Sequence, residues 1–357
     1  MPRIEISLPQ IQKNAQFLSE LYMGKAVSLM GVTKAVLGEP SVAKAMIQGG
    51  VKFIADSRIE NIIRMKNAGI SIPFVLLRTP LSQTESIIEN VNISLNTEIE
   101  TLKKLSYHAK EQNKIHQVII MAELGDLREG VLLSDLSQFI RKTLSLPHLA
   151  IIGIGCNLAC YGGIIPDDKN MQELSKLVDS LEKEFQIDLK IISGGNSANH
   201  EWFKSCKNVG RVNNIRLGES ILLGCETISR KAIPGLHTGA FQLVAEVIES
   251  KKKPSLPFGE IGQDAFGNIP SFQDRGIHQR VIIALGNQDV VPTGLHFNNK
   301  LKLLGSSSDH IILDSKCNSI KAGDEVRASL NYGGLLSTMT SPFVRKHFTD
   351  CNGSAAI

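Results

Sequence analysis

Lys34 combines a reactive amine with an apolar flanking sequence. It lies in Leu29–Ala35, where a hydrophobic run typical of a buried strand ends in a single lysine and is followed by turn-forming residues. Most lysines lie on the surface, and this segment alone does not exclude a surface position. At the end of a barrel strand, however, a lysine amine lies at the open mouth of the barrel, where it can condense with an aldehyde cofactor.

A second set of residues is suited to phosphate. Ser193–Ser197, with the sequence SGGNS, follows an apolar run and precedes a helical pattern, so its backbone amides and the Ser197 hydroxyl can bind a phosphate group. Arg216–Glu219 follows the next apolar run, and loops after strands seven and eight of (β/α)8 barrels often bind phosphate. A lysine, a phosphate loop and an arginine together indicate pyridoxal 5'-phosphate.

These residues need a framework that brings strand ends together. Apolar runs rich in valine and isoleucine alternate with helical patterns, including Ser57–Ala68, Glu98–Gln112 and Asp168–Phe185. Eight strand-helix units in roughly 200 residues are typical of an α/β fold of the (β/α)8 TIM barrel type, with a doubly wound sheet as the alternative. We predict strands over residues 26–32, 51–55, 72–77, 91–95, 117–123, 149–155, 189–193 and 213–217.

The pattern changes after Arg230. Pro234–Gly235 and Gly239 indicate a hinge, and short apolar runs separated by glycine, proline and asparagine follow. We therefore predict a barrel domain over residues 1–232 that binds pyridoxal 5'-phosphate, and a smaller, mostly-β C-terminal domain over residues 233–357. The first residues of the chain can instead join the β domain.

The composition excludes several classes of protein. Of the 357 residues, 42% are hydrophobic, which suffices for a large core and more than one domain. The 39 basic and 35 acidic residues are dispersed, so we expect a small-molecule substrate and neither a nucleic-acid nor a membrane partner.

Cysteine usage indicates a reducing compartment. The six cysteines are scattered and the chain starts without a signal peptide, which predicts reduced thiols and a cytoplasmic protein. Cys156 and Cys160 are the only close pair, and no second pair or nearby histidine completes a zinc site, so we predict no metal. We interpret both as packing residues. The other four are Cys206, Cys225, Cys317 and Cys351.

The combined order of these motifs resembles the alanine racemase family, the fold-type III pyridoxal-phosphate enzymes, and particularly its ornithine racemase and amino-acid racemase branch. Glu5–Leu8 with Asn14 is similar to the family's opening segment, and Val32–Ala35 to its cofactor-lysine motif. Arg128 in Gly125–Arg128 resembles the arginine that contacts the cofactor phenolate and the substrate carboxylate. The resemblance implies a cofactor site formed by Lys34, Arg128, Asn157, Asn196, Ser197, Arg216, Gly218 and Glu219.

Four positions depart from the family pattern. Asn157 replaces a ring-stacking histidine, and Gly38 and Phe348 stand where phosphate-contacting tyrosines are expected. Phe258 stands where the partner subunit's tyrosine base is expected, and phenylalanine cannot accept a proton. The resemblance also places Gly305–His310 in a loop that reaches the partner's active site.

Asp309 or His310 is therefore a candidate for the second catalytic residue. A simple hydrogen-bonded turn explains these two residues equally well, and Asp264 or a bound water is a further candidate for the base.

The resemblance implies a homodimeric racemase that interconverts L- and D-amino acids by proton transfer at Cα, with Lys34 acting on one face and a second base on the other. Ornithine or lysine follows from the branch, and alanine or serine stays open. The alternatives are a decarboxylase or an aldolase or dehydratase of the same fold type that also uses pyridoxal 5'-phosphate, and a non-enzymatic protein that binds this cofactor. The added domain after Arg230 argues against the last of these.

Overall fold

The computed structural model describes residues 1–316 and 319–349, which divide into two compact units. One unit is Gln10–Thr238, and the other combines Met1–Pro9 with the chain from Gly239 onward. The division therefore falls at 238/239 instead of at 232/233. Residues between these points bond to the first unit, because the Ile233 amide donates to the Gly224 carbonyl (2.9 Å) and the His237 amide donates to the Asn14 side chain (2.7 Å).

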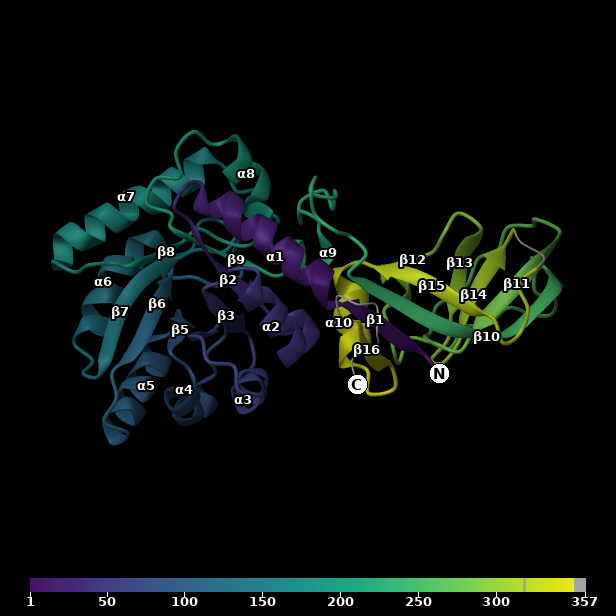
Figure 1. Cartoon of the computed structure of the whole chain (residues 1–357), viewed down its shortest axis with the longest axis horizontal. Coiled ribbons are helices and arrows are strands. Elements are labelled where there is room, and N and C mark those ends of the chain that lie inside the picture. Colours follow the sequence, from purple (N-terminus) through teal and green to yellow (C-terminus); the bar gives the residue numbers. More distant parts are fainter. Residues whose placement is uncertain (317–318, 350–357) are drawn as a thin grey trace. The chain divides into compact units, whose positions relative to one another are not determined.

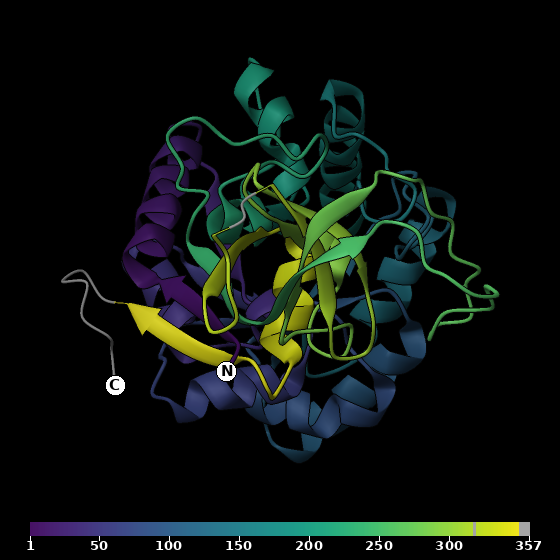
Figure 2. The ribbon, with the colours of Figure 1, turned by 90° about the vertical axis from the view of Figure 1, so that its right-hand side faces the viewer.

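The unit Gln10–Thr238 is a closed barrel of eight parallel strands, which confirms the predicted (β/α)8 fold and excludes a doubly wound sheet. The ring closes because β2 pairs with both β3 and β9. Figures 1 and 2 show the helices, coloured purple to teal, outside the strands. The strands are β2 (Ser28–Val32), β3 (Phe53–Asp56), β4 (Phe74–Leu76), β5 (Ile93–Asn96), β6 (His116–Met121), β7 (Leu149–Gly155), β8 (Ile191–Ser193) and β9 (Asn214–Leu217).

The helices of the barrel pack through apolar faces. In α7 (Asp168–Phe185) the buried residues Leu174, Val178 and Leu181 recur at helical spacing, and a capping box formed by Asp167 and Asn170 begins the helix. The other helices are α1 (Leu8–Met23), α2 (Pro40–Gln48), α3 (Ile59–Asn67), α4 (Thr84–Asn90), α5 (Ile99–Glu111), α6 (Leu133–Leu144), α8 (His200–Ser205) and α9 (Glu219–Leu223), with short 3-10 turns η1 (Lys34–Val36), η2 (Leu81–Gln83) and η3 (Ser197–Asn199).

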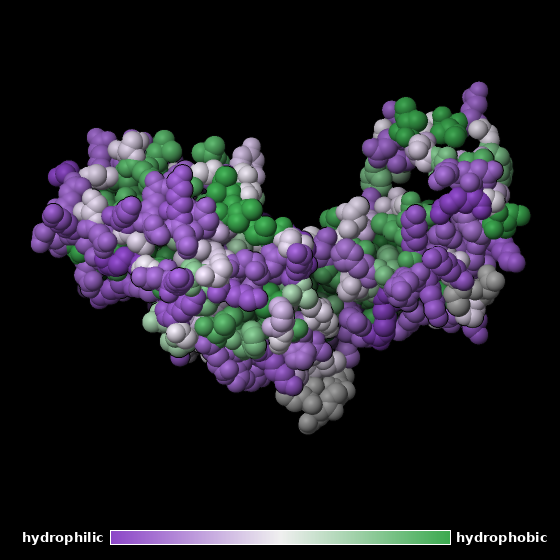
Figure 3. Space-filling view, turned by 90° about the horizontal axis from the view of Figure 1, so that it is seen from above, coloured by the Kyte–Doolittle hydropathy of each residue, from purple (hydrophilic) through white to green (hydrophobic). Residues whose placement is uncertain are grey.

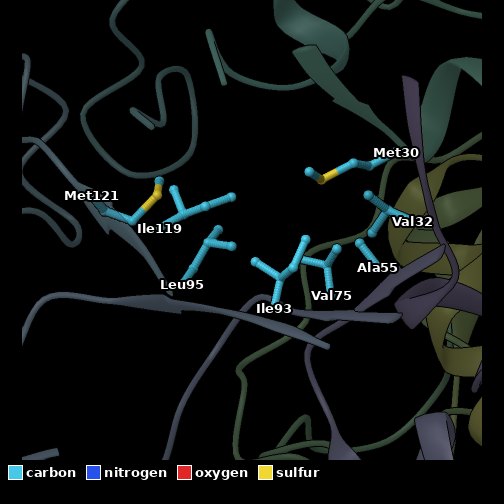
Figure 4. Close-up of a cluster of buried hydrophobic side chains, with 8 residues drawn as sticks. All are labelled: Met30, Val32, Ala55, Val75, Ile93, Leu95, Ile119 and Met121. Atoms are coloured by element: carbon cyan, nitrogen blue, oxygen red, sulfur yellow. The ribbon is translucent and has the colours of Figure 1, made fainter. Parts of the chain in front are cut away.

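The interior of the barrel is filled by side chains. Figure 4 shows eight buried residues whose side chains point toward one another from successive strands. They are Met30, Val32, Ala55, Val75, Ile93, Leu95, Ile119 and Met121. Because this apolar layer fills the barrel, polar chemistry is confined to the strand ends and the loops that follow them.

The second unit is mostly β, as predicted. Its central sheet has the order β12-β15-β10-β11-β14-β13, and β1 pairs with β10 and β16, which explains why the first residues belong to this unit. The strands are β1 (Arg3–Ser7), β10 (Phe241–Pro254), β11 (Ile277–Ile283), β12 (Leu295–His296), β13 (Leu301–Ser306), β14 (Ile311–Ser315), β15 (Glu325–Leu330) and β16 (Arg345–Thr349), with the 3-10 turn η4 (Pro292–Gly294) and one helix, α10 (Tyr332–Thr340).

Among the described residues, no helix combines the length and the apolar character that crossing a membrane requires.

Candidate active site

The predicted site residues of the barrel follow its strands. Lys34 comes directly after β2, Arg128 lies in the loop after β6, and Asn157 lies in the loop after β7. Asn196 and Ser197 follow β8, and Arg216, Gly218 and Glu219 lie in β9 and at the start of α9. Because the strands are parallel, their carboxyl ends lie at the same end of the barrel.

The turn that carries Lys34 is fixed by buried contacts. The Thr33 hydroxyl donates to Asp56 (2.8 Å), and the Asn61 side-chain amide donates to the other oxygen of that carboxylate (2.9 Å). Gly38 has a positive φ of 59°, and a Cβ there would lie 2.7 Å from the Asn61 Cβ and 2.9 Å from its carbonyl oxygen. A tyrosine at position 38 is therefore sterically excluded.

The surroundings of Lys34 favour its neutral form. Burial lowers its pKa from the ordinary value, and the nearby positive charges of Arg128 and Arg216 lower it further. Within the described residues, its Nζ forms no hydrogen bond or ion pair. A neutral amine is the form that attacks a carbonyl or accepts a proton.

Arg216 is buried and held by the ends of neighbouring strands. Its Nη1 donates to the Ser193 hydroxyl (2.5 Å), and its Nη2 donates to the Cys156 carbonyl (2.8 Å) and to the Asn157 side-chain oxygen (3.3 Å). The side chain is buried, and this burial lowers its pKa. These contacts fix the guanidinium at the mouth of the barrel.

Two asparagines connect the loops after β7 and β8. Asn196 donates to the Asn157 side-chain oxygen (2.8 Å) and to the Leu158 carbonyl (2.8 Å), while its own oxygen accepts from the Ala198 amide (2.8 Å). Asn157, at the position where the resemblance expects a histidine, therefore contacts both Asn196 and Arg216. It serves as a hydrogen-bonding link between loops.

Ser197 lies beside the start of α9. Its hydroxyl oxygen accepts from the Ser220 amide (3.2 Å), and the Ser220 hydroxyl is buried without a partner in the described structure. A serine hydroxyl that accepts one bond still has a proton to donate. Glu219 itself forms an ion pair with Arg230, and burial raises the pKa of its carboxyl. Its side chain is thus committed to Arg230.

Arg128 contacts a residue that the sequence analysis did not identify. Its Nε and Nη2 bond to the two carboxylate oxygens of Glu129, with 2.6 Å between Nη2 and Oε1. Glu129 also accepts from the Asn157 side-chain amide (3.3 Å). Its position next to Arg128 in the chain was the only sequence signal, and neighbouring charges are too common to be specific.

Cys160 was wrongly interpreted as a packing residue. It is exposed, and its sulfur accepts from the side-chain amides of Asn157 (3.2 Å) and Asn196 (3.4 Å). Cys156 is buried, as a packing residue should be. Cys317 and Cys351 lie outside the described residues.

The candidates for the second base belong to the β unit. The Asp309 carboxylate bonds to the His310 Nδ1 (2.7 Å) and accepts from the Ser307 hydroxyl (3.2 Å), so both residues lie in a hydrogen-bonded turn. The contact with His310 lowers the pKa of Asp309. Asp264 accepts from the Phe266 amide (2.9 Å) within another turn.

The residues at the barrel mouth fit pyridoxal 5'-phosphate. Lys34 supplies an amine without a described partner, and Ser197 and Ser220 supply hydroxyls near a strand end. Arg128 and Arg216 add two cationic groups, which complement a phosphate and a carboxylate. This combination is compatible with a phosphorylated aldehyde and with a substrate that carries a carboxylate.

The chain is similar to a protein family, to curated racemases and to solved structures. The alanine racemase N-terminal domain family matches residues 6–225. An ornithine racemase from Acetoanaerobium sticklandii is 40% identical over 97% of this chain and 99% of its own length. A lysine racemase from Thermotoga maritima is 37% identical, over 97% and 98% respectively. The solved alanine racemase from Bartonella henselae with covalently bound pyridoxal phosphate has a TM-score of 0.73 at 18% identity, covering 97% of this chain and 99% of that one.

The chain belongs to the alanine racemase family, whose members are barrel enzymes that use an aldehyde cofactor. It is an amino-acid racemase that depends on pyridoxal 5'-phosphate.

Proposed function

We propose that this protein racemises a basic amino acid, with ornithine as the preferred substrate and lysine as a second one. The observation that carries the proposal is the match, over nearly the entire length of each chain, to an ornithine racemase and a lysine racemase. The site agrees with this activity, because a half-buried lysine amine lies near the charges of two arginines at the barrel mouth.

The cofactor is held by residues from several loops in this proposal. Lys34 would bind the aldehyde carbon, and Ser197 and the Gly218 amide would bind the phosphate. Asn196 fixes the phosphate loop by capping η3. Pyridoxal 5'-phosphate, when bound, withdraws electrons from the substrate Cα and stabilises the negative charge left by proton removal.

The arginines orient the reacting groups. Arg128 binds the substrate carboxylate. Arg216 would face the ring nitrogen of the bound cofactor, and because a guanidinium is a donor without an acceptor, it would keep that nitrogen unprotonated. This role of Arg216 would favour return of the proton to Cα.

Lys34 moves the proton on one face of Cα. Its lowered pKa keeps a larger share of the amine neutral, so it can accept the Cα proton and later return it. We assign the opposite face to Asp309 or His310 of a second copy. The exposed fractions of the two side chains are 56% and 42%, which supports this role because a base needs access to the substrate.

A homodimer follows from the need for this second base. Apolar residues are exposed on both units, as Figure 3 shows by colour, and large exposed apolar groups are typical of protein interfaces. On the barrel they include Leu127, Tyr161 and Ile165 in loops after β6 and β7, and on the β unit they include Phe258, Ile261 and Ile269 between β10 and β11. We propose that these surfaces meet between two copies.

We also place the protein in the cytoplasm. The four described cysteines are all free thiols, which supports a reducing compartment. Fractionation of source cells with antibodies against the protein should recover it with cytoplasmic markers, and recovery with exported proteins would contradict this location.

Chiral chromatography tests the proposed activity. Purified protein with the cofactor is incubated separately with L-ornithine, L-lysine and L-alanine. We expect D-ornithine to form fastest and D-lysine next, and both reactions should approach equal amounts of the enantiomers. Formation of a diamine with release of carbon dioxide would support a decarboxylase instead, and no conversion of any amino acid would contradict racemisation.

A further inference from the structure

We infer that Glu129 is a positioning residue that holds the guanidinium of Arg128 in the orientation needed for the substrate carboxylate. This inference rests on the proposed function, because it takes Arg128 as the carboxylate-binding residue. Glu129 itself touches neither the substrate nor the cofactor in this account, and it acts through Arg128.

The contact between Arg128 and Glu129 fixes the orientation of the guanidinium as well as its distance from the carboxylate. Nε and Nη2 of Arg128 donate to separate oxygens of Glu129, and the second bond measures 2.6 Å. Two parallel bonds define the plane of a guanidinium, whereas a single bond leaves it free to rotate. The Arg128 side chain is 40% exposed, so packing alone does not hold it. The remaining edge of the guanidinium is then presented in a fixed direction.

Glu129 also connects Arg128 to the rigid part of the site. Its Oε1 accepts a bond from the Asn157 side-chain amide (3.3 Å), and the Asn157 oxygen accepts from Arg216 (3.3 Å). Arg216 is buried and anchored by the Ser193 hydroxyl and the Cys156 carbonyl. The bridge of Glu129 and Asn157 therefore ties a half-exposed arginine to a fixed one. The carboxylate site and the second arginine keep a constant separation.

An ordinary surface ion pair would show a different pattern. Arg141 and Glu184 form such a pair on helices α6 and α7, with 2.8 Å between their charged atoms and with no described link to the barrel mouth. Exposed pairs of this kind usually contribute little. Oε1 of Glu184 is shared with Ser137 on the same surface, whereas Oε1 of Glu129 is shared with Asn157, which contacts Arg216. The surface pair consequently offers a matched control.

The experiment compares Glu129→Gln, Glu129→Asp and the control Glu184→Gln with the wild-type holoenzyme. Propionate carries a carboxylate and no amine, so calorimetric binding of propionate measures the carboxylate site alone. We expect Glu129→Gln to weaken propionate binding and raise KM for ornithine by about tenfold, because a misplaced binding group loses its alignment. Glu129→Asp, which keeps the charge, should bind propionate more tightly than Glu129→Gln. Glu184→Gln should match the wild type.

A spectroscopic measurement separates positioning from general stability. The Nε–H signal of Arg128 in nitrogen-15 spectra, assigned by its loss in Arg128→Lys, should be sharp in the wild type and in Glu184→Gln. It should broaden in Glu129→Gln while the unfolding midpoint stays unchanged. If both Glu129 variants keep this signal and wild-type propionate affinity while Arg128→Lys loses that affinity, Glu129 does not position Arg128. If the wild-type protein neither racemises ornithine nor binds propionate, the proposed function fails instead.

Discussion

Lys34 differs from an ordinary lysine through its surroundings. Burial is the largest cause of its lowered pKa, and the charges of Arg128 and Arg216 act in the same direction because they repel an ammonium group. The sequence alone predicted the position of this lysine at a strand end. It did not reveal how strongly the two arginines would influence it, because they come from distant segments.

The direction in which the pKa of Lys34 is shifted can be measured. A lysine reacts only when deprotonated, so its acylation rate rises with pH and levels off above its pKa. In cofactor-free protein we expect the inflection for Lys34 to lie below the ordinary value of 10.5 and to move upward in Arg128→Gln, which removes one repelling charge. Competitive acetylation followed by peptide mass spectrometry measures this. An inflection at or above the ordinary value, unaffected by Arg128→Gln, would contradict the electrostatic account.

The proposed second base predicts that the two faces of the substrate respond unequally to mutation. If Asp309 or His310 serves the face opposite Lys34, replacing it by Asn or Gln should slow exchange of the Cα proton in one enantiomer far more than in the other. General acid and base groups commonly contribute roughly a hundred- to ten-thousand-fold. Exchange of D- and L-ornithine with deuterium from solvent, followed by NMR, measures the asymmetry. Wild-type exchange of both enantiomers in both variants would assign the base elsewhere, with Asp264 or a bound water next to be tested.

At the level of elements, the turn after β2 positions Lys34, and Gly38 is essential to it. A Cβ at position 38 would press on Asn61, and the positive φ of 59° strains any other residue. We expect Gly38→Ala to lower the free energy of unfolding by about 1–3 kcal/mol and to weaken cofactor binding. Gly69→Ala is the matched control, because φ is also positive there (78°) and no atom lies within 4 Å.

Denaturant unfolding and cofactor titration of both variants measure these effects. Equal losses in the two variants would show that only backbone strain matters. In that case the contact with Asn61 would have no special role in the turn.

The positions of strands were predictable because Val- and Ile-rich runs end at turn-forming residues. The predicted start positions of the strands were less accurate. The predicted strand over 26–32 begins at Ser28, because Ala26 adopts a left-handed conformation (φ 56°) in the turn that ends α1.

Helix α10 was not predicted. Two glycines and several hydroxyl residues give it low intrinsic helix propensity, and burial of Leu335 and Met339 stabilises it instead.

At the scale of the whole molecule, the exposed apolar residues between β10 and β11 predict a dimer. Phe258 is 93% exposed and Ile269 is 77% exposed. Replacing both by Asp should shift the protein toward monomer and reduce racemisation. Ile115→Asp is the control, because Ile115 is also exposed but immediately precedes β6, at the end of the barrel opposite Lys34. Sedimentation velocity measures the change, and a fully active wild-type monomer would contradict shared active sites.

The barrel residues of the site could be predicted because each follows a recognisable strand. Contacts between loops could not, since Glu129, Asn157 and Asn196 meet only when the loops after β6, β7 and β8 fold against one another. The boundary between the units was also misplaced, because the proline and glycine at 234–235 lie in a segment that is hydrogen-bonded to the barrel.

We propose that Lys34 holds the cofactor and acts on the substrate Cα. Borohydride reduces the bond between a lysine and pyridoxal 5'-phosphate to a stable amine, and peptide mapping then identifies the labelled residue. We predict that the label is found on the peptide containing Lys34, and that Lys34→Ala loses both the label and the visible absorbance of the bound cofactor. Labelling of a different lysine in the wild-type protein would contradict this role of Lys34.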